Sequence, residues 1–248
     1  MDFKRVPAID KCFQILEFLA KGKEPQGITQ ISNELELNKS TVFNMVYTLS
    51  DLGILENRDN KFGFGTKLYV LGKAAEQGSD LIRNIHPYLK EISEKTNLSA
   101  FLGIRSNLRA VIIDKSDSSL DLKISSEIGA AIPLVAGAHG KAFLSLLQDD
   151  EISRVLSDPK AQKYIRLAGK EIDGYISEVM KVKKDGFAFE DEEYLRGIRA
   201  LAIPLKLKRK DLECAIWAVG LKNQILETCL ESYTDFLKEV AAKIESKF

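Results

Sequence analysis

Along the first 65 residues, hydrophobic positions recur at helical spacing, and short polar segments interrupt them. A first helix is predicted over residues 7–22 from the stripe Ile9, Cys12, Leu16 and Leu19, with Gly22 at its end. Thr29 predicts the N-cap of a short second helix, and Asn38 predicts the start of a third. The buried stripe of the third helix is predicted to be Val42, Met45, Val46 and Leu49.

A β-hairpin is predicted directly after the third helix. Gly53 lies where helices commonly end in a left-handed residue. Residues 54–57 and 61–64 then flank the turn-forming segment 58–60. Three helices followed by a hairpin is the order of a winged helix-turn-helix, which predicts a DNA-binding domain over residues 1–65. The alternative is a generic small helical domain that ends in a hairpin.

The hydrophobic period indicates a different kind of domain in the rest of the chain. Two helices are predicted within residues 66–96, and the first, residues 66–79, is expected to link the domains. The elements predicted next are strands over 98–104, 110–113 and 120–124, helices over 140–147, 151–156 and 172–185, strands over 200–205 and 212–220, and a helix from about residue 224. They indicate an α+β domain over residues 80–248 with a mainly antiparallel sheet of about five to six strands.

Length and composition fit a globular protein of two domains. The chain has 248 residues, of which 45% are hydrophobic and 29% are charged. No apolar run approaches the roughly 20 residues that a membrane helix needs. The N-terminus leads into a charged amphipathic stretch rather than a signal-peptide core, so we expect a cytoplasmic protein that does not enter a membrane.

Net charge does not by itself indicate nucleic-acid binding. The chain has 36 basic and 36 acidic residues, and residues 1–65 have eight basic and nine acidic ones. If this domain binds DNA, the placement of its charges must be responsible rather than their total. A basic run at residues 206–210 falls in a predicted turn, where a solvated turn is favoured over a nucleic-acid contact.

Cysteine and histidine usage predicts neither a metal site nor a cofactor. Cys12, Cys214 and Cys229 have no short spacing and are expected to be small buried hydrophobes. With only His86 and His139, a histidine-rich metal site is ruled out, and a mixed site with carboxylates is the alternative. The chain has no phosphate loop, and the only candidate bases for catalysis are His139 and the acids of 190–193, so we expect no enzyme.

Three segments, taken in order, carry a family resemblance. They are Asn38-Lys39-Ser40-Thr41-Val42, then Pro133-Leu134-Val135-Ala136-Gly137-Ala138-His139-Gly140-Lys141-Ala142, then Gly186-Phe187-Ala188-Phe189-Glu190-Asp191-Glu192-Glu193 with Gly197-Ile198-Arg199-Ala200-Leu201-Ala202-Ile203-Pro204. Together they resemble the IclR family of transcription regulators. The resemblance implies a winged helix-turn-helix followed by a GAF-like α/β effector-binding domain, assembled as a dimer or a tetramer. It also implies binding to double-stranded operator DNA, repression more often than activation, and control by a small organic effector.

The candidate recognition helix is the third one. The candidate DNA-binding residues are Lys39, Ser40, Thr41, Phe43, Asn44 and Tyr47, with Arg58 and Lys61 on the wing. Residues 39–41 can meet phosphate at the helix start, and Asn44 can pair bidentately with adenine. The alternatives are helix capping for Ser40 and Thr41, and simple packing for Phe43 instead of contact with a thymine methyl. A sensor or scaffold module without specific DNA binding also stays open, because this domain is nearly neutral.

The resemblance also places an effector pocket in the second domain. Carried over by alignment, its lining is Ile124, Ile132, Ala138, His139, Glu190, Ile198, Ala200, Trp217 and Val219. Family members that bind small carboxylates carry hydroxyls or a thiol at the last three of these positions. The apolar side chains here argue against glyoxylate-sized acids and for an aromatic or larger apolar effector, or for a sensor that Trp217 plugs. Ordinary core packing is the alternative role for that indole.

Two polar features complete the predicted pocket. The backbone amides of residues 138–140, at the start of a helix, are expected to form an anion cradle, with Glu190 as an anionic wall. Arg199 is expected to orient either Glu190 or a neighbouring acid.

Overall fold

The computed structural model describes residues 4–22, 24–77, 80–167, 169–207 and 212–248. The chain divides into two compact units, residues 1–79 and residues 80–248. Within the described ranges, no helix combines the length and the apolar composition needed to cross a membrane.

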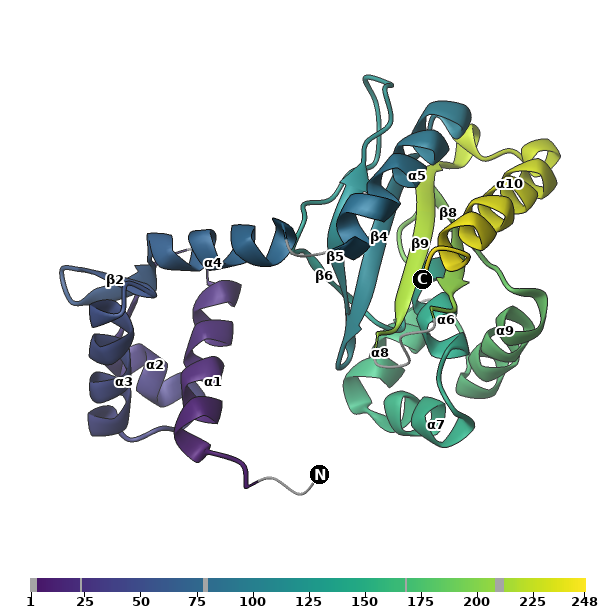
Figure 1. Cartoon of the computed structure of the whole chain (residues 1–248). Helices are drawn as coiled ribbons and strands as arrows, with labels where there is room; N and C mark the ends of the chain where they lie inside the picture. The colour runs from purple at the N-terminus through teal and green to yellow at the C-terminus, as the bar shows by residue number, and fades with distance from the viewer. Residues whose placement is uncertain (1–3, 23, 78–79, 168, 208–211) are drawn as a thin grey trace. The chain divides into compact units, whose positions relative to one another are not determined.

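The N-terminal unit is a winged helix-turn-helix, as predicted (Figure 1). Its elements are α1 (Pro7–Lys21), β1 (Gln26–Gly27), α2 (Ile28–Leu35), α3 (Lys39–Asp51), β2 (Leu55–Arg58), β3 (Lys61–Phe64) and α4 (Thr66–Gln77). The three strands form a small antiparallel sheet in the order β1-β3-β2. One apolar core joins the helices to the hairpin, and its buried residues are Ile15, Leu19, Ile31, Val42, Val46, Leu49, Leu55 and Phe62.

Local backbone geometry explains where these elements begin and turn. The prediction that Thr29 caps the second helix is wrong: Gly27 is the N-cap, because the preceding residues pair with β3 and pass directly into α2. The N-cap of α3 is Asn38, as predicted. The hairpin turns at Asp59 and Asn60, whose φ angles of 52° and 60° are those that a two-residue hairpin turn requires.

The C-terminal unit is a six-stranded antiparallel sheet with helices on both faces (Figure 1). Its elements are α5 (Asp80–Thr96), β4 (Ser99–Ser106), β5 (Arg109–Ser116), β6 (Ala131–Pro133), α6 (Gly137–Ser145), α7 (Asp149–Ser157), α8 (Pro159–Leu167), α9 (Ile172–Asp185), β7 (Ala188–Asp191), β8 (Ile198–Leu205), β9 (Cys214–Leu221), a 3₁₀ turn (Lys222–Gln224) and α10 (Glu227–Glu245). The strand order is β6-β5-β4-β9-β8-β7. This arrangement confirms the predicted α+β class.

Alternating side chains on the central strands supply two separate cores. On β9, Ala215, Trp217 and Val219 join the core under α6–α9, whereas Cys214, Ile216 and Ala218 join the core under α5 and α10. A sheet that is buried on both faces needs apolar residues at every position, which is why β8 and β9 are continuous hydrophobic runs in the sequence.

Several predicted features differ from the structure. No strand forms over residues 120–124, where Leu120 and Leu122 are exposed, because alternation alone supplies neither a pairing strand nor a core. Helix α8 and the short edge strands β6 and β7 were not predicted. Burial is confirmed for Cys214 but not for Cys12 or Cys229, which are only half-buried. Residues 208–211 of the predicted basic turn lie outside the described residues.

Candidate functional site

The predicted recognition helix presents a polar face to solvent. Val42, Val46 and Leu49 point into the core of the unit. Because α3 is therefore buried on one side only, its opposite side exposes the remaining predicted residues: Lys39, Ser40, Phe43, Asn44 and Tyr47, with Thr41 half-buried beside them. These six positions thus share the accessible part of one helix, as a groove-reading element requires.

Aromatic packing ties this face to the wing. The rings of Phe43 and Tyr47 lie 4.5 Å apart, and Tyr47 meets Phe62 of β3 edge-on at 5.4 Å. Phe43 therefore packs against Tyr47, yet 48% of its surface stays exposed. Its position is compatible both with simple packing and with contact to a thymine methyl group. The side chain of Asn38, the N-cap residue of α3, makes no capping hydrogen bond. Helix capping stays an alternative role for Ser40 and Thr41, beside contact with phosphate.

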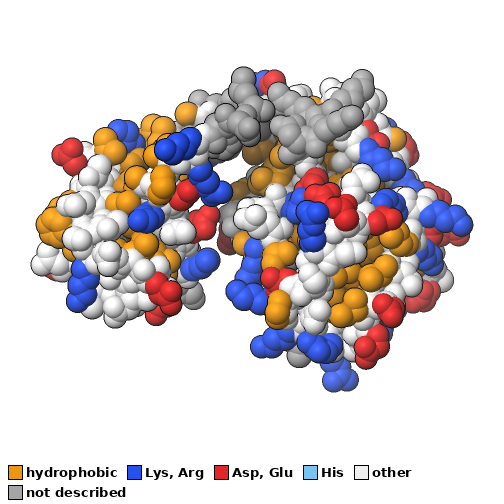
Figure 2. Space-filling model, turned by 90° about the horizontal axis from the view of Figure 1, so that it is seen from below, with side chains coloured by type: hydrophobic (Ala, Val, Ile, Leu, Met, Phe, Trp, Pro, Cys, Tyr) orange, Lys and Arg blue, Asp and Glu red, His pale blue; other side chains and the backbone are white. Residues whose placement is uncertain are grey.

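The two basic residues of the wing differ in their surroundings. Arg58 donates a hydrogen bond to Glu56 on the same strand at 2.7 Å, so its charge is partly compensated. Lys61 is exposed at the start of β3, across the turn from Arg58. On the face in Figure 2, basic and acidic side chains are intermixed, in agreement with the neutral charge balance.

The C-terminal unit contains a cavity of about 330 Å³ between its sheet and α6. Eight of the nine predicted effector residues line it: Ile124, Ile132, His139, Glu190, Ile198, Ala200, Trp217 and Val219. The ninth, Ala138, contributes only its backbone N–H, which donates to Glu190. The structure thus gathers these positions around one space, and their role in binding an effector stays a prediction.

Other lining residues were not predicted. They are Phe101, Ile112, Ser125, Ser126, Ala130, Ala131, Tyr194 and Leu195. The alternation of β4 could have placed Phe101 on the same face as its cross-strand partner Trp217. The loop residues 125–126 and 194–195 carry no such signal, because only the tertiary fold brings them to the cavity.

Trp217 forms a wall of this cavity and does not fill it. Its indole stacks on Phe101, with the ring centres 5.6 Å apart, and lies 5.4 Å from the His139 ring. Gly103 makes room for the indole, since a Cβ atom there would come within 2.7 Å of Trp217. The hypothesis that Trp217 plugs the pocket therefore does not describe this arrangement. The indole also packs in the core, which was the alternative role considered for it.

His139 lies in the wall of the cavity, and its Nε2 atom is fully buried. It lies in the first turn of α6 and is only 5% exposed. Burial lowers the pKa of its imidazole from 6.5 to about 4, although a hydrogen bond to the Pro133 backbone opposes this shift. Nε2 has no partner among the described residues, so Nδ1 must carry the proton donated to the Pro133 carbonyl. Near neutral pH, Nε2 is therefore an unprotonated acceptor.

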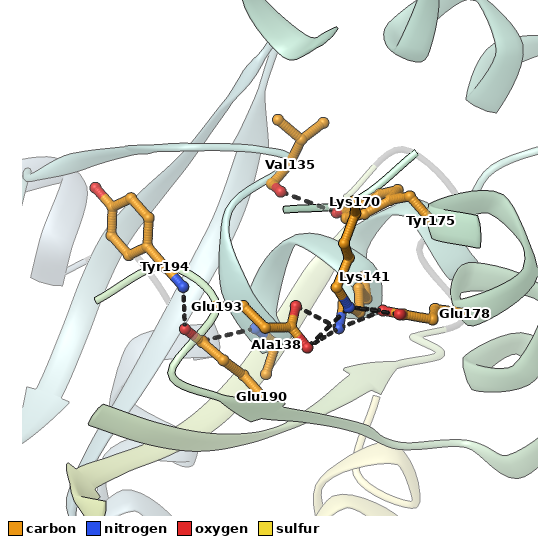
Figure 3. Close-up of polar contacts among 9 residues, drawn as sticks. All are labelled: Val135, Ala138, Lys141, Lys170, Tyr175, Glu178, Glu190, Glu193 and Tyr194. Atoms are coloured by element: carbon orange, nitrogen blue, oxygen red, sulfur yellow. Dashed lines mark hydrogen bonds and ion pairs between the residues drawn. The ribbon is translucent and has the colours of Figure 1, made fainter. Parts of the chain in front are cut away.

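Glu190 occupies the start of α6 (Figure 3). Its Oε2 accepts the Ala138 N–H at 3.1 Å, and its Oε1 accepts the Tyr194 N–H at 2.8 Å. Burial raises the pKa of this carboxyl, while the two backbone hydrogen bonds act in the opposite direction. Gly137 permits this approach, because a Cβ atom at that position would lie 2.2 Å from Oε2. The predicted anion cradle is thus filled by the protein's own carboxylate.

An ionic cluster anchors the segment that follows Glu190 (Figure 3). The Nζ of Lys141 lies 2.6 Å from Glu178 and 2.7 Å from Glu193. Lys170 pairs with the same two carboxylates, at 3.0 Å from Glu193. The Lys141 side chain is 4% exposed, so these carboxylates replace the solvent that would otherwise surround its ammonium group. The cluster joins α6 and α9 to residues 190–195, of which Glu190, Tyr194 and Leu195 line the cavity.

Arg199 was expected to orient either Glu190 or a neighbouring acid, and in the structure it contacts the neighbouring acid. Its guanidinium makes two hydrogen bonds of 2.8 Å to Asp191 rather than to Glu190. It also donates to Glu227 and to the Ile225 carbonyl of the segment that leads into α10. These contacts connect β8 to β7 and to the segment that leads into α10, and the guanidinium does not line the cavity.

Among the described residues, no group of His, Cys, Asp and Glu side chains is arranged to hold a metal ion.

Comparison with known proteins gives consistent matches over the whole chain. The family model described as "Bacterial transcriptional regulator IclR C-terminal" matches residues 73–246, and the "IclR helix-turn-helix domain" matches residues 8–59. The chain is 29% identical to the HTH-type transcriptional regulator KdgR of Escherichia coli, over 98% of this chain and 92% of that protein. It is 23% identical to the transcriptional repressor IclR of the same organism, over 97% and 89%.

Solved structures share the fold. An IclR family regulator from Brucella abortus matches with a TM-score of 0.84 at 20% identity, covering 98% of this chain and 93% of that one. An IclR homologue from Microbacterium hydrocarbonoxydans, crystallised with 4-hydroxybenzoate, matches with a TM-score of 0.75 at 18% identity, covering 96% and 98%.

Proposed function

The chain belongs to the IclR family of transcriptional regulators and is a DNA-binding regulator, and we propose that it represses transcription under the control of a small organic effector. In this proposal residues 1–65 bind operator DNA, residues 66–79 link the domains, and residues 80–248 bind the effector. The observation that carries the proposal is the exposed polar face of α3, held in place by a core that buries only the opposite side of the helix. Such a regulator acts in the cytoplasm, where bacterial DNA lies.

The effector role rests on the cavity beside α6. A space of about 330 Å³ lined mainly by apolar and aromatic side chains, with a few polar residues among them, has the character of a small-molecule site. The homologue crystallised with 4-hydroxybenzoate shows that a protein of this fold is compatible with a one-ring aromatic molecule. Both observations support the aromatic or apolar effector expected from Trp217 and Val219.

Footprinting on the DNA upstream of the protein's own gene tests whether the protein binds a specific site. Substitution of two lysines tests whether α3 and the wing contact the DNA. Lys39 at the start of α3 and Lys61 on the wing are both exposed. Each phosphate contact contributes about −0.9 to the slope of log affinity against log salt, so Lys39→Ala/Lys61→Ala should weaken binding and flatten this slope by about 2. Fluorescence anisotropy at several salt concentrations measures both quantities.

The matched control removes two exposed lysines from the C-terminal unit, in the variant Lys163→Ala/Lys181→Ala. It changes net charge equally and should leave the slope unaltered. An equal change in both variants would mean that only overall charge matters. No protected site in the footprint would instead favour the scaffold without specific DNA binding.

We further propose that the N-terminal unit dimerises through α1 and α4. Apolar side chains are exposed on both helices: Ile9, Phe13, Tyr69, Val70 and Leu71. Other apolar residues of the two helices are less exposed: Ile15 is buried in the unit's own core, and Phe18 and Leu68 are half-buried. Exposed apolar faces on a small domain favour association. A fragment of residues 1–79 should therefore dimerise in sedimentation equilibrium, and Phe13→Ser/Val70→Ser should make it monomeric.

Leu52→Ser provides the control for that experiment, because Leu52 is similarly exposed, at the end of α3. This variant should associate like the parent fragment. A parent fragment that stays monomeric at high concentration would contradict the proposal.

Catalysis, the other class considered from the sequence, finds little support in the cavity. A general base needs a free position near the reacting proton. Glu190 already accepts two backbone hydrogen bonds, Glu193 is paired with two lysines, and the Nε2 atom of His139 is fully buried. We therefore propose a binding role for these groups.

A further inference from the structure

A second cavity of the C-terminal unit lies between α8 and the segment that leads into α6. Its volume is about 380 Å³, and we call it the α8 pocket. Residues 133–135 line it on one side and Ala161 lines it from α8, and all of these residues are buried. Ala131 and Ile132 instead line the cavity beside α6, so β6 contributes its two ends to two different spaces.

The charged residues that line the α8 pocket are all basic. They are Arg109 at the start of β5 and Lys160 and Lys163 on α8, and all three are exposed. None of them forms an ion pair with a described residue, whereas many other exposed cations of this unit do, for example Arg154 with Asp150. Among its described lining residues, the pocket thus has three positive charges and no acid to balance them.

Hydrogen-bonding groups show the same bias. Three carbonyls of the lining, those of Leu108, Pro133 and Val135, already accept hydrogen bonds of 3.0 Å from within the unit. Arg109 donates once, to a backbone carbonyl of β6 at 3.5 Å, which leaves most of its N–H donors free. The Tyr164 hydroxyl makes no hydrogen bond with a described residue. Because the free groups are mainly donors, a ligand must supply acceptors.

The buried side of the pocket is apolar. Leu134 is 1% exposed and Ala161 is 5% exposed, so both form a floor below the charged residues. Lysine and arginine commonly lay their stems along such a surface and keep their charges at its edge. A space of this volume, apolar at the base and polar at a few points, is typical of small-molecule sites. The guanidinium of Arg109 has the planar geometry that fits a carboxylate or a phosphate group.

We propose that the α8 pocket is a second ligand site, which binds a small organic anion. The apolar body of the ligand contacts residues 133–135 and Ala161, and Arg109 and the two lysines of α8 bind its carboxylate or phosphate group. The proposal does not depend on the effector role of the cavity beside α6. A ligand in the α8 pocket contacts the residues that lead into α6, and so borders the wall of the first cavity.

Isothermal titration calorimetry on the full chain tests this with matched pairs of ligands at low ionic strength. The pairs are phenylacetate with phenylacetamide, and phenyl phosphate with phenol, so that carboxylate and phosphate ligands are distinguished. Hydrogen bonds to charged groups favour the anion, and the exposure of the cations limits the preference to about 10-fold. At least one anion should therefore bind more tightly than its neutral partner by about this factor, and added salt should reduce the difference.

The variant Arg109→Gln/Lys160→Gln should remove most of this preference. Its control is Arg166→Gln/Lys181→Gln, which removes one exposed arginine and one exposed lysine outside the lining and should keep the preference. If the first variant does not fold, Lys160→Gln alone, at an exposed helix position, should still reduce the preference by about 3-fold.

Equal binding of each anion and its neutral partner would overturn the proposal, and so would the failure of both anions to bind. An anion whose affinity is the same in Arg109→Gln/Lys160→Gln as in the unmodified protein binds elsewhere, which also contradicts it. An equal loss in the control variant would mean that only overall charge matters. None of these results affects the regulatory proposal, because operator binding is measured separately and without ligand.

Discussion

Replacing Glu178 and Glu193 together by Gln should lower the free energy of unfolding of the C-terminal unit by about 3 kcal/mol or more. The reason is the position of Lys141, whose side chain is 4% exposed and which lies within 2.7 Å of both carboxylates. Removing one side of a buried ion pair leaves the other charge without solvent or partner. Urea unfolding, followed by the fluorescence of Trp217, the single tryptophan of the chain, reports on this unit.

A third substitution separates this cause from mere loss of contacts. Adding Lys141→Met removes the stranded ammonium, and apolar residues of similar volume often replace a buried pair at little cost. The triple variant should therefore recover most of the lost stability. Asp150→Asn is the control, since its ion pair with Arg154 is exposed and should change stability by less than about 0.5 kcal/mol. A triple variant less stable than the double one would refute this account.

The elements that could be predicted from the sequence are those whose pattern of hydrophobic residues reflects burial on one face or on both faces. The stripe of α3 and the continuous apolar run of β9 both follow from what each buries. Residues 120–124 show the limit of this approach. They alternate as a strand would, yet no neighbouring strand pairs with them, and the exposed fraction of Leu122 is 70%.

The candidate cavity could be predicted only through family resemblance. Its residues come from β4, β5, β6, α6, β7, β8, β9 and loops between them, and no local period connects these segments. The decisive contact joins Ala138 to Glu190, which are 52 positions apart in the sequence. The sequence therefore predicts both the anion cradle and the acidic residue, but not that the cradle binds the carboxylate of Glu190. The ionic cluster around Lys141 is equally non-local and was missed.

The neutral imidazole of His139 should make the C-terminal unit less stable at acidic pH. Burial lowers its pKa from 6.5 to about 4, so between these values the unfolded chain binds a proton that the folded chain does not. The stability that the neutral form contributes is fully present above about pH 6.5 and is lost as the pH falls towards 4. At about 1.4 kcal/mol per pKa unit, the loss approaches about 3 kcal/mol over the whole window.

Urea unfolding of the unmodified protein and of His139→Gln measures this effect between about pH 7.5 and about pH 5, where it should reach about 2 kcal/mol. The lower limit of the pH range avoids the titration of most acidic side chains, because the carboxyls with lowered pKa, such as those of Asp117 and Glu178, titrate below their ordinary values. The raised pKa of Glu190 acts in the opposite sense and is present in both proteins. His139→Gln should therefore flatten the pH dependence, whereas His86→Gln, at the half-exposed histidine beside Asp114, should leave it in place. If the slope disappears with His86→Gln and persists with His139→Gln, the cavity histidine is not the group that titrates.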